Sequence, residues 1–267
     1  MKHIVLAAGY ATRLYPVTEH FPKPLLEIGG ISILDRLISD VDTIEDVDTH
    51  LIVSNHKYLP HFEKWKSNSR YTKNISIIDD GSDNNENRLG AVNDLLLAIE
   101  VGDITDDLLV LAADNVVDFS FQGLIDFFKQ KQTSLITTYY EPELSALQRT
   151  GVVTIDNDNK ALEMQEKPEK PKSHHAVPPF YIYKKNDIPL IKSCVQQNST
   201  MNVSLQNAAP HASYYMQRPR MDAPGNLVRY MLDKTIFHAW PMPGNRYDIG
   251  SLETYYNLKD KPLILNH

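Results

Sequence analysis

Short apolar runs alternate along the chain with segments whose apolar positions repeat every three or four residues. The runs are rich in β-branched residues and are expected to form strands at residues 3–8, 50–54, 75–79, 108–113 and 134–139. Between them, the segment from Leu89 to Glu100 places its large apolar side chains on one face of a helix. Such alternation of strand and helix is typical of parallel βαβ units.

The pattern changes after Gly151. Residues 151–155 and 161–167 flank the turn-forming residues 156–159, which predicts a β-hairpin. The closing elements are expected to be a helix with Asp222 as N-cap and Pro224 in its first turn, a strand at 235–240 and a helix after Ser251. The predicted fold class is α/β: a Rossmann-like, doubly wound, mixed and mainly parallel sheet with an antiparallel elaboration in the second half.

Composition narrows the class of protein. The 267 residues carry 27 Lys and Arg against 34 Asp and Glu, a net charge of −7, which speaks against nucleic acid as a partner. No apolar stretch reaches the roughly 18 to 20 residues of a membrane span, so we expect no membrane partner. The single cysteine, Cys194, favours a reducing compartment, and we expect a cytoplasmic protein. No linker divides residues 1–267, which indicates one domain.

In doubly wound sheets, ligands bind beyond the carboxyl ends of the strands, so residues that follow the apolar runs are the first candidates. The first run ends at Ala7-Ala8-Gly9, where small side chains let backbone N–H groups approach an anion. Arg13 and Lys23 add positive charge after this turn. The segment has neither a Walker loop nor a dinucleotide-binding glycine pattern. Taken alone, it predicts either a phosphate-binding loop or an ordinary connection with surface charges.

Two carboxylates also follow apolar runs. Asp114 ends the run at 108–113, and Asp248 stands before Gly250, which permits a tight turn. Carboxylate oxygens at such positions suit a divalent cation. An aspartate that caps a helix or forms a turn would have the same sequence surroundings, so the pattern leaves both roles open.

Taken together, these segments resemble one family, the sugar-1-phosphate nucleotidylyltransferases. The resemblance extends from Lys2 to Leu258 and is most specific in the string Leu-Ala-Ala-Gly-x-x-Thr-Arg-Leu-x-Pro-x-Thr, followed by Pro-Lys-Pro-Leu-Leu at residues 22–26. The later motifs keep the family's order: Arg88-Leu89-Gly90, Ala113-Asp114, Gly151-Val152-Val153, Glu166-Lys167-Pro168, Asp222-Ala223-Pro224-Gly225 and Tyr247-Asp248-Ile249-Gly250.

The resemblance implies a Mg²⁺-dependent enzyme that transfers a nucleotidyl group from a nucleoside triphosphate to a sugar 1-phosphate, by default glucose 1-phosphate, and releases pyrophosphate. It also implies that residues 1–140 mainly bind the nucleotide and residues 141–267 mainly the sugar phosphate. The implied nucleotide-binding residues are Leu6, Ala7, Ala8, Gly9, Thr12, Arg13 and Gly90. The implied sugar-phosphate-binding residues are Asn115, Gly151, Glu166 and Lys167. The implied metal ligands are Asp114 and Asp248, and the implied catalytic residues are Arg13, Lys23 and Lys167.

Two positions depart from the family pattern. Ala11 stands where many members have glycine, and we expect its φ to stay negative. Asn93 stands where relatives often carry Gln or His near the base, which leaves the base open; we favour UTP or dTTP. Two other functions stay open: a cytidylyltransferase acting on a non-sugar phosphate such as phosphocholine, and a non-catalytic sensor of nucleotides or sugar phosphates. A homo-oligomer is also open, since relatives are often dimers or tetramers.

Overall fold

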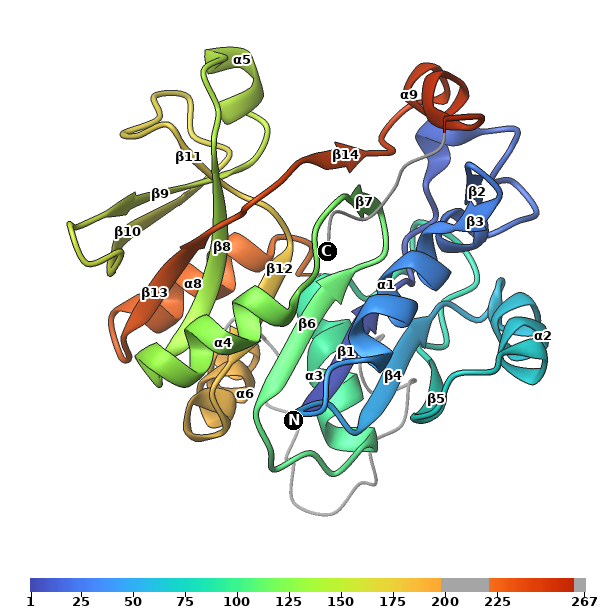
Figure 1. The fold of residues 1–267 in the computed structure, drawn as a ribbon, viewed down its shortest axis with the longest axis horizontal. Helices are drawn as coiled ribbons and strands as arrows, with labels where there is room; N and C mark the ends of the chain where they lie inside the picture. The colour runs from blue at the N-terminus through green and yellow to red at the C-terminus, as the bar shows by residue number, and fades with distance from the viewer. Residues whose placement is uncertain (198–220, 262–267) are drawn as a thin grey trace.

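One sheet runs through both halves of the chain (Figure 1). The computed structural model describes residues 1–197 and 221–261. Within them, ten strands form a sheet in the order β10-β9-β11-β8-β12-β6-β1-β4-β5, and β13 pairs with β8. The sheet is mixed, with its parallel group at one side and its antiparallel strands at the other, as the sequence predicted.

The first half of the chain builds the parallel group. β1 (Lys2–Leu6) pairs with β4 (Thr49–Ser54) on one side and β6 (Leu108–Ala112) on the other, and β5 (Asn74–Asp79) pairs with β4. All four strands were predicted, and their observed ends differ from the prediction by at most two residues. Their carboxyl ends lie at one edge of the sheet, where the candidate residues follow.

The second half adds the antiparallel strands. β8 (Ser134–Tyr140) does not pair with β6, because β12 (Phe180–Tyr183) lies between them and runs antiparallel to both. The predicted hairpin is confirmed as β9 (Gly151–Ile155) and β10 (Ala161–Glu166). β11 (His175–Val177) joins this hairpin to β8.

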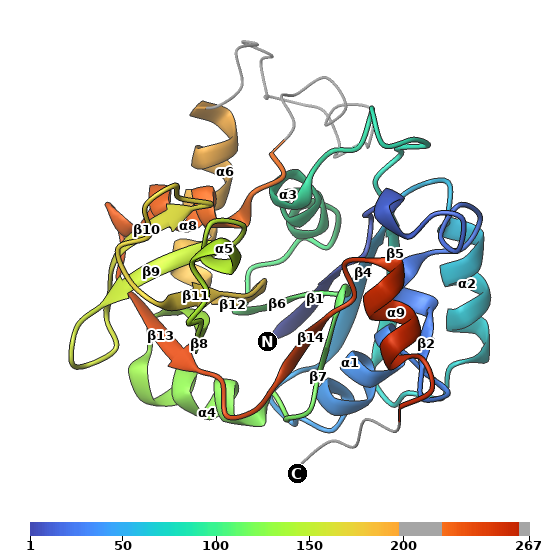
Figure 2. The same cartoon turned by 90° about the horizontal axis from the view of Figure 1, so that it is seen from above.

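Helices cover both faces of the sheet (Figure 2). Neighbouring strand residues point to opposite faces, so that Ile4 packs in the core under α3, α6 and α8, while Val5 packs in the core under α1 and α4. The α-helices are α1 (Ile33–Asp42), α2 (Leu59–Asn68), α3 (Ala91–Val101), α4 (Gln122–Lys131), α5 (Leu144–Leu147), α6 (Ile188–Gln197), α8 (Pro224–Leu232) and α9 (Leu252–Leu258). The short 3-10 helices are η1 (Thr12–Leu14), η2 (Lys23–Leu25) and η3 (Lys185–Asp187). Cys194 is buried in α6, as a small apolar core residue.

The helix boundaries correct one prediction. Asp222 is not the N-cap of α8: Ala223 holds that position, and the Asp222 carboxylate pairs with Arg88 instead. The helix predicted from Leu89 begins at Ala91, with Gly90 as its N-cap. The helix predicted after Ser251 is confirmed as α9.

A small antiparallel ribbon lies at the carboxyl edge of the parallel strands (Figure 1). It consists of β7 (Asn115–Val117) and β14 (Arg246–Asp248), and its register places Asp248 opposite Asn115. The remaining strands are β13 (Phe237–Pro241), β2 (Glu27–Ile28) and β3 (Ile31–Ser32). Among the described helices, none has the length and hydropathy needed to span a bilayer.

Candidate active site

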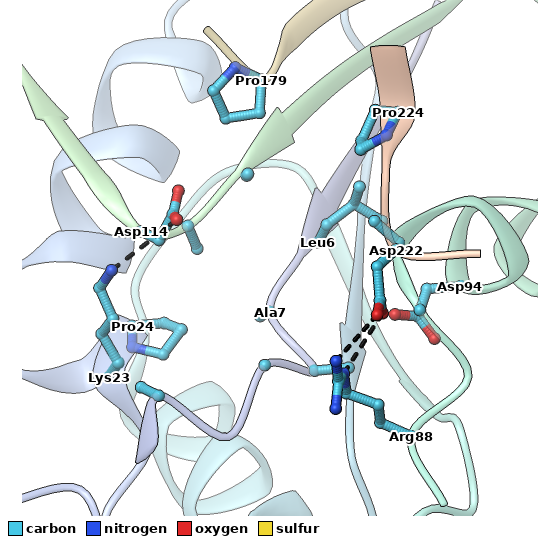
Figure 3. Close-up of a pocket in the computed structure, with 17 residues that line it drawn as sticks. Leu6, Ala7, Lys23, Pro24, Arg88, Asp94, Asp114, Pro179, Asp222 and Pro224 are labelled. Atoms are coloured by element: carbon cyan, nitrogen blue, oxygen red, sulfur yellow. Dashed lines mark hydrogen bonds and ion pairs between the residues drawn. The ribbon is translucent and has the colours of Figure 1, made fainter. Parts of the chain in front are cut away.

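A cavity of about 340 Å³ opens at the carboxyl ends of β1 and β6 (Figure 3). Its walls come from the loop after β1, the start of η2, the end of β6, the first turn of α3 and the segment before α8. Seven of the sequence-derived candidates line it: Leu6, Ala7, Ala8, Gly9, Lys23, Gly90 and Asp114. Residues separated by most of the chain therefore meet at the edge of the sheet that the strand pattern indicated.

The loop after β1 is held in place from both sides. The Asn55 side chain donates a hydrogen bond of 2.9 Å to the Ala8 carbonyl, and the Thr18 hydroxyl donates one of 2.8 Å to the Ala11 carbonyl. The expectation that Ala11 keeps a negative φ is wrong, because its φ is +45°. A single methyl group tolerates this left-handed conformation at a cost of about 1 to 2 kcal/mol. Gly9 has no other atom of the described chain within 4 Å of an added Cβ, so its side faces open space.

The two cations of this region, Lys23 and Arg13, lie at different depths. Lys23 is buried, and its Nζ lies 3.8 Å from Oδ2 of Asp114. Thr12 and Arg13 belong to η1 and are exposed, outside the cavity lining. Desolvation raises the pKa of Asp248, and the positive charge of Arg13 opposes that rise.

The structure brings the two predicted metal ligands together. Asp114 precedes β7 and Asp248 ends β14, and the Ile249 N–H donates a hydrogen bond of 3.3 Å to the Asp114 carbonyl. Although the Asp248 side chain meets solvent, desolvation in the cleft raises its pKa, and the charge of Asp114 raises it further. Within the described residues, no group of three metal-ligating side chains occurs. Two carboxylates suit Mg²⁺, which completes its shell with water and substrate phosphate.

Arg246 links this pair to the rest of the sheet. It donates a hydrogen bond of 2.5 Å to the Asn115 side-chain carbonyl and one of 3.1 Å to the Tyr139 hydroxyl. The Asn115 amide in turn donates to Oδ1 of Asp114. The charge of Arg246 also lowers the pKa of Asp248. A chain of hydrogen bonds thus fixes the direction of the Asp114 carboxylate.

The sugar-side candidates form a second group on β9 and β10. A Cβ on Gly151 would lie 2.5 Å from the Met164 side chain, and one on Gly225 would lie 2.1 Å from Oε2 of Glu166. The ends of the Met164 and Glu166 side chains occupy that space and would have to shift to admit a Cβ. Burial raises the pKa of Glu166, against the nearby charges of Lys167 and Arg229.

None of the sugar-side candidates lines the cavity itself. Burial raises the pKa of Tyr181, and the charges of Glu166 and Asp114 raise it further. Lys167 is exposed, with a φ of +47°, and its N–H donates to the Thr150 carbonyl at 3.1 Å. The sugar-side group therefore lies beside the cavity and not in its lining, because Gly225, which contacts Glu166, directly follows the lining residue Pro224.

The opposite end of the cavity surrounds Gly90. This residue has a φ of +89°, and an added Cβ would lie 2.7 Å from the Met221 backbone. Only glycine fits this conformation and this contact. Asn93, proposed to lie near the base, is buried and donates a hydrogen bond of 3.0 Å to the Leu89 carbonyl. The polar loop at residues 84–87 is exposed and closes on itself through side-chain hydrogen bonds.

Comparison with known proteins decides the family. Residues 2–262 match the model of the nucleotidyl transferase family. The chain belongs to this family. It is 31% identical over 192 residues to the bifunctional protein GlmU of Methanocaldococcus jannaschii. The matched segment covers 72% of this chain and 42% of the relative. It is 25% identical over 264 residues to glucose-1-phosphate adenylyltransferase of Geobacillus stearothermophilus, which covers 95% of this chain and 63% of the relative.

Solved structures show the same fold. An apo UDP-glucose pyrophosphorylase matches with a TM-score of 0.75 at 17% identity, covering 97% of this nucleotidyl transferase and 96% of that chain. UDP-glucose pyrophosphorylase from Acinetobacter baumanii matches with a TM-score of 0.69 at 15% identity, covering 96% and 91%. The chain spans less than two thirds of the length of the curated relatives it matches.

Sequence reasoning missed several residues of the transferase's cavity. Arg88 belongs to the Arg88-Leu89-Gly90 motif, but its partner Asp222 is 134 positions away. The sequence predicts a helix cap at Asp222 and gives no sign of this ion pair. Asp94 lines the cavity from the first turn of α3, and a carboxylate among apolar helix residues was the signal for it. Arg246 lies two residues before the predicted metal ligand Asp248, and nothing in its local sequence indicates the contact with Asn115.

Proposed function

We propose that this nucleotidyl transferase transfers a nucleotidyl group to a sugar 1-phosphate, by default glucose 1-phosphate, and releases pyrophosphate. The observation that carries the proposal is the grouping of Lys23, Asp114 and Asp248 beside the Gly9 loop. Membership of the family supports the reaction class, and the glucose-1-phosphate adenylyltransferase among the relatives supports a sugar phosphate as acceptor.

The reaction needs no nucleophile from the protein. A phosphate monoester has a second pKa of about 6, so the acceptor is largely dianionic at neutral pH and needs no general base. Its oxygen bonds to the α-phosphorus of the triphosphate as the bond to pyrophosphate breaks. The protein then contributes positioning and charge stabilisation. Buried Lys23 would neutralise the transferring and leaving phosphates, and the backbone around Gly9 would hold the triphosphate with Arg13.

Asp114 and Asp248 would hold Mg²⁺, which when bound supplies Lewis-acid and positioning chemistry at the α-phosphate. The raised pKa of Asp248 supports this assignment, because a cation between the two carboxylates relieves their repulsion. The Arg246–Asn115 hydrogen bonds would keep the Asp114 carboxylate oriented toward the same point.

The acceptor would bind on the β9–β10 side. Lys167 would grip the acceptor phosphate, while Glu166, Asn115 and the backbone of Gly151 would contact the sugar. Gly90 would let the base approach the backbone closely. In this assignment, residues 1–140 mainly bind the nucleotide and residues 141–267 mainly bind the sugar phosphate, within one domain.

Product formation tests the proposal. The protein is incubated with Mg²⁺, glucose 1-phosphate or phosphocholine, and one of UTP, dTTP, CTP, GTP or ATP, and the nucleotide products are separated by anion-exchange chromatography. We expect a nucleotide sugar from at least one pair, and none from the Asp114→Asn variant. Asp103→Asn makes the same change at an exposed position and should retain activity. A product from phosphocholine alone, or nucleotide binding without any product, contradicts the proposal.

A further inference from the structure

One buried carboxylate lines the cavity at the end away from Lys23 and Asp114. Asp94 is 6% exposed, and its Oδ1 has no hydrogen-bond partner among the described residues. In Figure 3, its carboxylate points toward that of Asp222, on the other side of the cavity from the Lys23–Asp114 pair. A buried acceptor without a donor costs about 1 to 3 kcal/mol, and more when it is charged.

The polar groups around Asp94 are committed elsewhere. Arg88 holds Asp222 through Nη2 at 2.8 Å and Nε at 3.2 Å, and it also donates to Asn85. Asp80 accepts hydrogen bonds of 2.7 Å from both the N–H and the hydroxyl of Ser82. Burial raises the pKa of Asp94 well above its usual range, and the charges of Asp80 and Asp222 raise it further. Asp94 is therefore a polar group that the described protein leaves unsatisfied.

The surroundings limit what could supply the missing donor. Three acids would repel a phosphate or carboxylate group of a ligand. Arg88 already neutralises Asp222 and Ser82 donates to Asp80, so these carboxylates do not offer a second ligand for a cation at Asp94. A neutral N–H donor is not repelled by the acids and needs no further ligands from the protein. On binding, it would favour the ionised form of the Asp94 carboxylate. The group that belongs at this point is thus an uncharged N–H donor of a ligand.

The position of the cavity identifies that part. If the triphosphate lies between Gly9, Lys23 and Asp114, as the proposed function requires, the base lies at the far end, where Asp94 and Gly90 line the cavity and Gly90 abuts Asp222. We infer that Asp94 recognises the nucleotide base by accepting a hydrogen bond from an exocyclic amino group. Cytosine, adenine and guanine carry that group. Uracil and thymine carry a carbonyl oxygen in its place, which cannot donate to the unpartnered Oδ1 of Asp94. This inference rests on the proposed function, and it differs from the preference for UTP or dTTP drawn from the sequence.

The test compares kcat/KM for CTP, dCTP, ATP, GTP, UTP and dTTP between the wild type and Asp94→Asn. We expect the wild type to prefer an amino-bearing base to UTP by at least about tenfold, the usual range for one base contact. An asparagine can turn either its NH₂ or its carbonyl to the base, so Asp94→Asn should bring that ratio close to one. Asp103→Asn should leave the ratio unchanged.

Three results would overturn the inference. The first is a wild-type preference for UTP or dTTP, and the second is an unchanged ratio in Asp94→Asn. The third is a change only in the ratio of CTP to dCTP, which would assign Asp94 to the ribose. Thermal melting establishes that each variant folds, and Asp94→Ala serves if Asp94→Asn does not. Calorimetric binding of CTP and UTP needs no turnover, so it tests the base preference even if the proposed transfer fails.

Discussion

At the scale of single residues, Gly9 and Gly90 occupy the same cavity for different physical reasons. Gly9 has open space beside it, whereas Gly90 has a φ of +89° and the Met221 backbone where a Cβ would be. We predict that Gly9→Ala folds normally but raises the KM for the triphosphate by about tenfold or more, because the methyl group blocks close approach of the phosphates to the backbone. Gly90→Ala should lower the free energy of unfolding by about 1 to 3 kcal/mol. Urea unfolding and KM measurements on both variants check this; a destabilised Gly9→Ala contradicts it.

The same scale shows what the sequence could predict about the site. Asp114 was predicted from its motif and strand-end position, Lys23 from its charge after the first turn, and Gly90 from the family resemblance alone. All three line one cavity. Asp222 was misassigned, because its partner Arg88 lies 134 positions away and an aspartate before a proline resembles a helix cap. Ala11 was misassigned because residue type alone suggested a negative φ, whereas the hydrogen bonds to its carbonyl select the left-handed conformation.

At the scale of elements, the β7–β14 ribbon carries Asn115, Arg246 and Asp248 and so positions the candidate metal site. Arg246 both orients Asp114 through Asn115 and lowers the pKa of Asp248 by its charge. Removing the charge in Arg246→Met raises the Asp248 pKa further, so the acid limb of the pH–activity profile should move to higher pH. Arg246→Lys keeps the charge but not the two hydrogen bonds, so it should keep the acid limb while lowering kcat. An acid limb that does not move in Arg246→Met would remove Arg246 from this role.

The strands were predicted because a sheet covered on both faces requires apolar runs, and β1, β4, β5 and β6 all have them. Their order in the sheet was not predictable in the same way. β12 is short, follows two prolines and lies between β6 and β8, and only long-range packing sets that position. The β7–β14 ribbon was not predicted either, because strands of three residues are too short to show a periodic apolar pattern.

At the scale of the whole molecule, stability depends on a buried histidine pair at the far end of β1 and β4. The Nδ1 atoms of His3 and His50 lie 2.9 Å apart, and both side chains are fully buried. Burial lowers the pKa of both histidines. In the unfolded chain each binds a proton below about pH 6.5, before the folded state does, so the free energy of unfolding should fall as pH drops through that range.

Urea unfolding between about pH 8 and pH 5 measures this dependence. Each histidine contributes up to about 1.4 kcal/mol per pH unit below pH 6.5. The free energy of unfolding of His3→Gln should therefore depend less on pH than that of the wild type. His20→Gln, a change at an exposed position, should show the same pH dependence as the wild type. Identical profiles for the wild type and His3→Gln would show that this pair does not titrate on unfolding.

Acceptor-dependent release of pyrophosphate tests the central claim most directly. The initial rate is measured with Mg²⁺ and the preferred triphosphate, with and without the sugar 1-phosphate, for the wild type and for Asp114→Asn. We predict release that requires the sugar 1-phosphate and that falls by orders of magnitude in a correctly folded Asp114→Asn protein. Equal rates with and without the acceptor, or normal release by Asp114→Asn, would contradict nucleotidyl transfer at this site.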